Sequence, residues 1–257
     1  MRINIGFQKI YLSQIKEKKI FLLIGFTFII IYFSVLIDVN TNVILMYHSI
    51  IDGIAYRDFS VLAIIRFLVL HLIYIYFFSL STNFKDNTYL YLAFNRLGNI
   101  GIWYQNTLLY AAFLGMFYWG IMLIGFIIYL LILTAFIGEL SLFYHVIFSK
   151  KTVLFFLFSI LSSISLANIF LSIKNIVKKE NIAFASVTFL LLCYIFSFYL
   201  VGERHFLFFN TDILTVERIS STFFGENAII INIFWQFIQN LIISIFTITY
   251  LKKKGLE

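Results

Sequence analysis

Six apolar stretches, each long enough to cross a lipid bilayer, constrain this chain more than any other feature. They cover residues 20–37, 59–80, 107–133, 152–173, 182–202 and 228–250. The hydrocarbon core of a bilayer is about 30 Å thick and an α-helix rises about 1.5 Å per residue, so about 20 apolar residues span it. Unpaired backbone groups are too costly in lipid, so stretches of this length are helical. The sequence therefore predicts an all-α integral membrane protein with six transmembrane helices.

Basic residues are distributed unequally between the two sets of connecting segments. The segment before span one, the segments after spans two and four, and the segment after span six together hold 13 Lys and Arg and four acidic residues. The other segments hold five basic and eight acidic residues. Cytoplasmic segments collect Lys and Arg, so both termini are expected in the cytoplasm. The net charge of +7 thus reflects topology, and we expect no nucleic-acid partner because no soluble face displays a basic patch.

The composition supports one membrane domain over residues 1–257. Apolar residues make up 62 % of the chain, which excludes a disordered chain and an ordinary soluble domain. Cys193 is the single cysteine, so an internal disulfide or a CxxC redox motif is impossible.

The first 19 residues predict an amphipathic helix lying on the membrane surface. One face, at spacings i, i+3, i+4 and i+8, carries Phe7, Ile10, Tyr11 and Ile15. Lysines on the other face suit anionic lipid headgroups. The alternative is a basic start to the first span.

The segment 81–105 predicts a short cytoplasmic helix. Asp86 or Asn87 can cap its start and Gly98 can end it. The apolar residues on one of its sides are Leu90, Phe94 and Leu97. It is either a docking site for a cytoplasmic partner or a connection resting on the interface. Glycines and amides in 98–106 favour an interfacial break before the third span.

Motifs for catalysis or metal binding are missing from the sequence. It contains no GxxxxGK[ST] phosphate loop, no GxSxG and no HExxH. The chain is therefore not expected to be an enzyme by itself, or to bind a cofactor. Glu203 and His205 lie two residues apart in an outer segment, and we interpret them as solvated loop residues.

Polar residues inside the spans are costly and normally face protein or water. In the sixth span, Asn232, Gln236, Asn240 and Ser244 repeat every four residues, with Gln239 beside them. This stripe either forms hydrogen bonds between helices or lines a transport path.

Two further sets of residues within the spans carry an interpretation. Ser159, Ser163 and Ala167 have the small-xxx-small spacing that favours close helix packing. Arg66 and His71 lie in the second span. Arg66 either extends toward the outer interface or faces a neighbour or a cavity.

The arrangement resembles the ABC-2 type transporter permeases. The resemblance rests on six spans with both ends inside, the amphipathic start, the helical loop after span two and the apolar outer segment after span five. The stretch YLAFNR at 91–96, followed by Trp103-Tyr104, is similar to small permeases of bacteriocin and amphipathic-peptide exporters. The segment between spans two and three is less basic than is usual in that family, with only Lys85 and Arg96.

The resemblance implies a bacterial cytoplasmic-membrane permease that pairs with a second permease, identical or different, and with a separate ATPase that binds ATP and Mg. It implies peptide substrates such as bacteriocins or phenol-soluble modulins, for secretion or for immunity. The implied coupling-helix residues are Asp86, Leu90, Phe94 and Arg96. The implied outer gate residues are Glu203, Phe206, Phe209 and Phe224. The expected translocation path holds Arg66, His71, Asn232, Gln236, Gln239 and Asn240. The alternatives are an intramembrane enzyme and a membrane scaffold that transports nothing.

Overall fold

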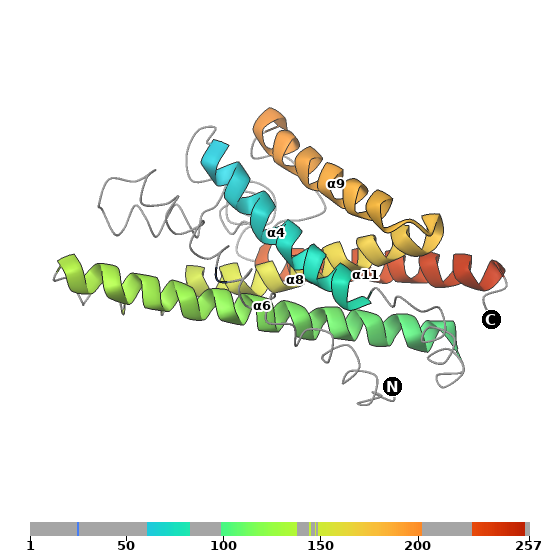
Figure 1. Ribbon diagram of the computed structural model, residues 1–257, viewed down its shortest axis with the longest axis horizontal. Helices are drawn as coiled ribbons and strands as arrows, with labels where there is room; N and C mark the ends of the chain where they lie inside the picture. The colour runs from blue at the N-terminus through green and yellow to red at the C-terminus, as the bar shows by residue number, and fades with distance from the viewer. Residues whose placement is uncertain are drawn as a thin grey trace.

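The computed structural model is helical wherever it describes regular structure. It describes residues 61–82, 99–137, 149–201 and 228–254, with the single residues Gly25, Tyr144 and Ile147. The helices are α4 (Val61–Thr82), α6 (Ile100–Ile137), α8 (Lys150–Val177), α9 (Glu180–Val201) and α11 (Ala228–Lys253) (Figure 1). The all-α prediction is confirmed for these ranges.

Four of these helices are long and apolar enough to cross a membrane. Their apolar segments are Ile64–Thr82, Ile100–Ile132, Thr152–Val177 and Ile233–Lys253. Helix α9 contributes a shorter apolar segment, Glu180–Phe196. The predicted first span and the predicted surface helix, residues 1–37, lie outside the described residues except for Gly25.

Helix α6 is longer than the predicted third span, and the predicted break over 98–106 is wrong from Ile100 onward. The polar side chains there bond to the helix instead of ending it. Asn106 Nδ2 donates to the carbonyl of Ile102 at 2.9 Å, and Thr107 Oγ1 donates to that of Trp103 at 3.0 Å. Side chains that bond back to the preceding turn leave the helical backbone bonds intact, so the helix continues.

Helices α4 and α6 run antiparallel. The Tyr74 hydroxyl of α4 donates to the carbonyl of Ala111 at 2.8 Å, and the Tyr118 hydroxyl of α6 donates to that of Leu70 at 2.9 Å. Residue numbers rise along one helix as they fall along the other. The C-terminal end of α4 therefore lies at the N-terminal end of α6.

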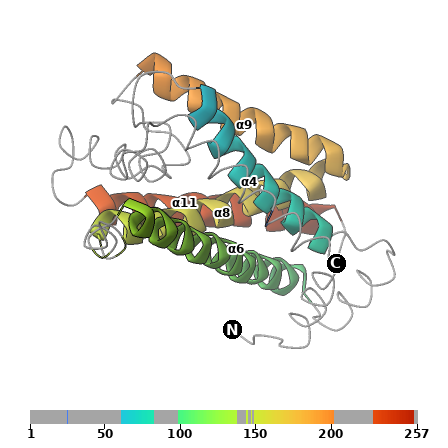
Figure 2. The same cartoon turned by 60° about the vertical axis from the view of Figure 1, so that its left-hand side comes forward.

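Helices α8 and α9 form a tight hairpin, and α11 returns parallel to α8. Lys178 ends α8 in the left-handed conformation, at φ 58° and ψ 20°, and its N–H donates to the Lys174 carbonyl at 2.8 Å. Helix α9 then starts at Glu180. Figures 1 and 2 show α8 and α11 side by side. The five helices described thus alternate in direction along the chain.

The core between α4, α6 and α8 is aromatic and closely packed. Trp119, Tyr74 and Tyr118 are buried, and the Trp119 indole Nε1–H donates to Ser163 Oγ at 2.8 Å. A Cβ at Gly115 of α6 would lie 3.7 Å from Ser163 Cβ and 3.8 Å from the Tyr74 ring. The three small residues predicted to pack closely are all buried: Ser159, Ser163 and Ala167. Small residues on both helices therefore set the crossing of α6 and α8.

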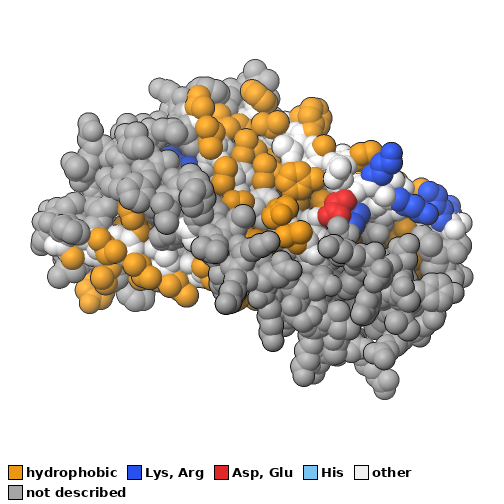
Figure 3. Space-filling view, in the orientation of Figure 1, with side chains coloured by type: hydrophobic (Ala, Val, Ile, Leu, Met, Phe, Trp, Pro, Cys, Tyr) orange, Lys and Arg blue, Asp and Glu red, His pale blue; other side chains and the backbone are white. Residues whose placement is uncertain are grey.

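The outer surface of the helices is apolar. Exposed hydrophobic side chains cover much of the described face in Figure 3, while charged side chains gather at the end where α9 begins. On α11, Ile230, Phe234, Phe237 and Phe246 are each more than half exposed. An apolar surface with charge at one end is typical of a helical membrane protein.

Candidate functional site

A buried cluster of amides and hydroxyls joins α6, α8 and α11. We call it the amide–hydroxyl cluster. Its members are Tyr104 of α6, Ser165, Asn168 and Ser172 of α8, and Asn240, Ser244 and Thr247 of α11. Its side chains are uncharged, which suits a site inside a membrane domain.

Asn168 is the centre of the cluster. Its Nδ2 donates to Asn240 Oδ1 at 3.0 Å and lies 3.3 Å from Ser244 Oγ. Its Oδ1 accepts the Tyr104 hydroxyl at 2.6 Å. Asn168 is fully buried. Through these hydrogen bonds its one side chain connects α8 to α6 and α11.

Hydrogen bonds among neighbouring side chains extend the cluster in both directions along the helices from Asn168. Asn240 Nδ2 donates to Ser165 Oγ at 2.7 Å and to the carbonyl of Gln236 at 3.0 Å. Thr247 Oγ1 donates to Ser172 Oγ at 2.8 Å, and Ser172 Oγ in turn contacts the Tyr104 hydroxyl at 2.8 Å. Interhelical hydrogen bonds in membrane proteins contribute about 0.6 kcal/mol on average and at most about 1.7 each. Together they fix the rotation of α11 against α8.

The predicted stripe of the sixth span lies partly within this cluster. Asn240 and Ser244 form the hydrogen bonds between helices that the first of the two interpretations requires. Gln236 and Gln239 are also buried, at 2 % and 7 % exposure. The side chain of Asn232 lies outside the described residues. A transport path along the stripe remains a prediction.

Arg66 and His71 are both buried in the bundle, at 8 % and 2 % exposure. His71 Nδ1 donates to the Phe67 carbonyl at 2.9 Å, and the imidazole packs 5.7 Å from the Trp119 ring. Five residues of helix separate Arg66 from His71 by about 140° around α4 and about 7.5 Å along it. They therefore project in different directions from α4 and do not form one ionisable pair.

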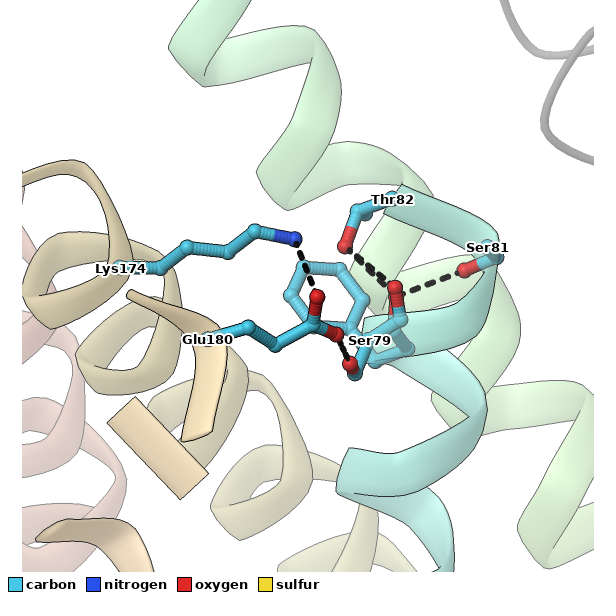
Figure 4. Close-up of polar contacts among 6 residues, drawn as sticks. Ser79, Ser81, Thr82, Lys174 and Glu180 are labelled. Atoms are coloured by element: carbon cyan, nitrogen blue, oxygen red, sulfur yellow. Dashed lines mark hydrogen bonds and ion pairs between the residues drawn. The ribbon is translucent and has the colours of Figure 1, made fainter. Parts of the chain in front are cut away.

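An ion pair with a hydrogen bond connects the ends of α4, α8 and α9 (Figure 4). Lys174 Nζ of α8 lies 3.7 Å from Glu180 Oε2 of α9, and the Ser79 hydroxyl of α4 donates to Glu180 Oε1. Lys174 lies in the last turn of α8 and Glu180 in the first turn of α9. In each place the helix dipole stabilises the charge. We call these three residues the α4–α8–α9 clamp. The predicted spans placed Lys174 and Glu180 in the segment between spans four and five, and their pairing was not predicted.

The coupling-helix and outer-gate predictions fall outside the described residues, which omit 83–98 and 202–227. The coupling residues concerned are Asp86, Leu90, Phe94 and Arg96. The gate residues concerned are Glu203, Phe206, Phe209 and Phe224. What the structure does describe is the pair of ends that residues 83–98 join, Thr82 of α4 and Asn99 before α6.

Sequence reasoning overlooked Tyr104 and Asn168 as site residues. Asn168 is an amide within an apolar span, the same signal that marked Asn240 on α11. It lies one residue from Ala167 of the small-residue face, and that face attracted the structural interpretation. Tyr104 fell within the stretch expected to be interfacial.

The described residues contain no group of three or more His, Cys, Asp or Glu placed to hold a metal ion. Comparisons with protein-family models, with curated proteins and with solved structures find no match to this chain.

Proposed function

We propose that this chain is the membrane-spanning permease subunit of an ATP-driven exporter of amphipathic or antimicrobial peptides. A separate cytoplasmic ATPase binds and hydrolyses the ATP, because the chain has no phosphate loop. A second permease subunit completes the membrane part. The proposal rests on the resemblance to ABC-2 type permeases together with the arrangement of the helix ends.

One observation carries most of the weight. The C-terminal ends of α4, α8 and α11 and the N-terminal ends of α6 and α9 lie at one end of the bundle. Thr82 and Asn99, the described residues on either side of the segment 83–98, both lie at that end. Exposed lysines follow α8 and close α11 at the same end. A docking helix for a cytoplasmic ATPase in 83–98 is consistent with this geometry.

The proposed substrate class follows from the apolar character of the chain. A peptide with one apolar face needs apolar surface and few charged anchors to move through a membrane domain. Large apolar side chains such as Phe113 and Phe117 of α6 and Phe234 and Phe237 of α11 are exposed on the helices. They offer contact area for such a peptide or for the second permease.

A membrane scaffold without transport activity is the second proposal, and the amide–hydroxyl cluster favours it. In that cluster the side-chain amides of Asn168 and Asn240 bond to each other and to neighbouring hydroxyls. Amides that form their hydrogen bonds within the bundle do not need a passing substrate as a hydrogen-bond partner. The scaffold proposal predicts normal assembly with partners in the absence of any ATP-dependent substrate movement.

Affinity purification tests for the ATPase partner. The tagged chain, solubilised from its native membrane, is expected to retain an ATPase subunit. Leu90→Asp or Phe94→Asp is expected to release it, since a charge buried in an apolar contact costs several kcal/mol. Asn95→Asp introduces the same charge next to Phe94 in the sequence, off the predicted apolar face, and is the matched control. Retention of the ATPase by both Leu90→Asp and Phe94→Asp would remove the docking role, and absence of any ATPase from the wild type would remove the exporter proposal.

A further inference from the structure

The ends of α8 and α11 form a basic surface. Exposed Lys178 and Lys179 follow α8, and exposed Lys252, Lys253 and Lys254 close α11. The two helices run parallel and are joined by the 2.8 Å bond from Thr247 to Ser172. Six residues beyond that bond, α8 reaches Lys178 and α11 reaches Lys253. The two groups of lysines therefore lie at the same level of the bundle, and the charged side chains at that end are visible in Figure 3.

These five ammonium groups have no carboxylate partner among the described residues. Glu180 is the acidic residue within the described ranges, and it is engaged by Lys174 and Ser79. The lysines lie in the last turn of α11 or just after α8 and α11, where the partial negative charge of a helix C-terminus favours cations but does not neutralise them. Within the ranges that the structure describes, the positive charge of this surface is therefore uncompensated, which suits an anionic partner.

An apolar stripe runs along α11 directly away from the lysines. Ile242, Phe246 and Lys253 share one face at spacings i, i+4 and i+11, and Ile242 and Phe246 are 59 % and 63 % exposed. Eleven residues of helix measure about 16 Å, close to half of the roughly 30 Å hydrocarbon core. Between stripe and charge, the Tyr250 ring lies 4.7 Å from Lys254 Nζ, and tyrosine is typical of the membrane interface.

We propose that this surface binds an anionic phospholipid, with its phosphate at the lysines of α11 and its acyl chains along Ile242 and Phe246. A soluble phosphate or an acidic protein would use the charge and leave the apolar stripe without a role. A zwitterionic lipid would bring its own ammonium group toward the lysines. An anionic lipid such as phosphatidylglycerol satisfies both parts of the surface, and this role is independent of transport.

The test is native mass spectrometry of the full chain in mild detergent, offered equal amounts of phosphatidylglycerol and phosphatidylcholine with the same acyl chains. One basic residue near an anionic surface strengthens binding about fivefold. With three lysines on α11, partly screened, the wild type is expected to retain phosphatidylglycerol at least about tenfold better. The variant Lys252→Gln/Lys253→Gln/Lys254→Gln is expected to lose the preference.

Two control variants keep the test decisive. Replacing the same three lysines by arginine preserves the charge and is expected to preserve the preference. Lys150→Gln removes an exposed lysine at the opposite end, where α8 begins, and is expected to change nothing. Circular dichroism checks that each variant is folded.

Three results would overturn the proposal. The first is equal retention of the two lipids by the wild type. The second is an unchanged preference in the folded glutamine variant. The third is complete displacement of the lipid by an equal concentration of glycerol 3-phosphate, which would identify a site for soluble phosphate. Loss of the lipid preference with ATPase binding intact, or the reverse, separates this proposal from the proposed function.

Discussion

The side-chain amide of Asn168 on α8 donates to the side-chain oxygen of Asn240 on α11 at 3.0 Å, 72 residues away in the chain. Both residues lie inside segments apolar enough to cross a membrane. In hydrocarbon an unpaired amide is costly, so each residue compensates the cost of the other. This bond makes the parallel pairing of α8 and α11 specific.

A double-mutant cycle measures the energy of this pair. Asn168→Ala and Asn240→Ala each leave the partner amide with fewer bonds, and each is expected to destabilise the fold by about 1–2 kcal/mol. The double variant is expected to cost less than the sum, with a coupling energy of about 0.5–1.5 kcal/mol. Unfolding by a denaturing detergent in mixed micelles provides the measurement. Exposed Asn181→Ala is the control, and strict additivity would show that the two amides do not stabilise each other.

The close approach of α6 and α8 predicts different effects at two glycines of the same helix. A leucine at Gly115 would be forced against Ser163 and Tyr74, and Gly115→Leu is expected to cost about 1–3 kcal/mol. Nothing lies within 4 Å of a Cβ at Gly120, so Gly120→Leu is expected to stay within about 0.5 kcal/mol of the wild type. Thermal unfolding in detergent compares the two variants. Equal stability of both would mean that α6 and α8 do not cross at Gly115.

Orientation in the membrane is tested by thiol labelling of exposed lysine positions. In a Cys193→Ser background, Lys179→Cys and Lys254→Cys are expected to resist an impermeant thiol reagent in intact cells and to react after permeabilisation. Lys150→Cys at the opposite end is expected to react in intact cells. Ser81 is unsuitable as a probe because it is 2 % exposed, so shielding there would reflect burial. Labelling of Lys179→Cys without permeabilisation would reverse the predicted topology.

Measuring assembly and export together distinguishes a packing role of the polar stripe on α11 from a role in the transport path. Gln236→Leu/Asn240→Leu removes bonds to α8 and is expected to lower the yield of folded protein. If the stripe only packs helices, export per assembled complex stays at the wild-type level. A fall in export per complex, with substrate-stimulated ATP hydrolysis also changed, would instead place the stripe in the path. Exposed Thr249→Leu on α11 is the control for added bulk.

The positions of the described helices were largely predictable, because apolar length determines where membrane-spanning helices lie. The spans predicted over 59–80 and 228–250 correspond to Val61–Thr82 and Ala228–Lys253. The start of α6 was not predicted. Gly98–Asn106 suggests a break when composition is considered, whereas the Asn106 side chain bonds back into the helix.

The contacts between helices were far less predictable. The stripe containing Asn240 was visible in the sequence, but its partners depend on how α8 and α11 rotate and shift against each other. A single sequence carries no measure of that rotation, so Tyr104 and Asn168 were not singled out. Likewise, Lys174 and Glu180 appeared as loop charges because the predicted spans ended at 173 and began again at 182. The structure extends α8 to Val177 and starts α9 at Glu180.

Peptide uptake by inside-out membrane vesicles tests the exporter proposal most directly. Vesicles that contain this chain with its co-purifying ATPase are supplied with a fluorescent amphipathic peptide. The expected result is accumulation that requires hydrolysable ATP, that stops with Phe94→Asp and that persists with Asn95→Asp. Active ATP hydrolysis by an intact complex, without accumulation of any amphipathic peptide offered, would contradict the proposal and favour the scaffold.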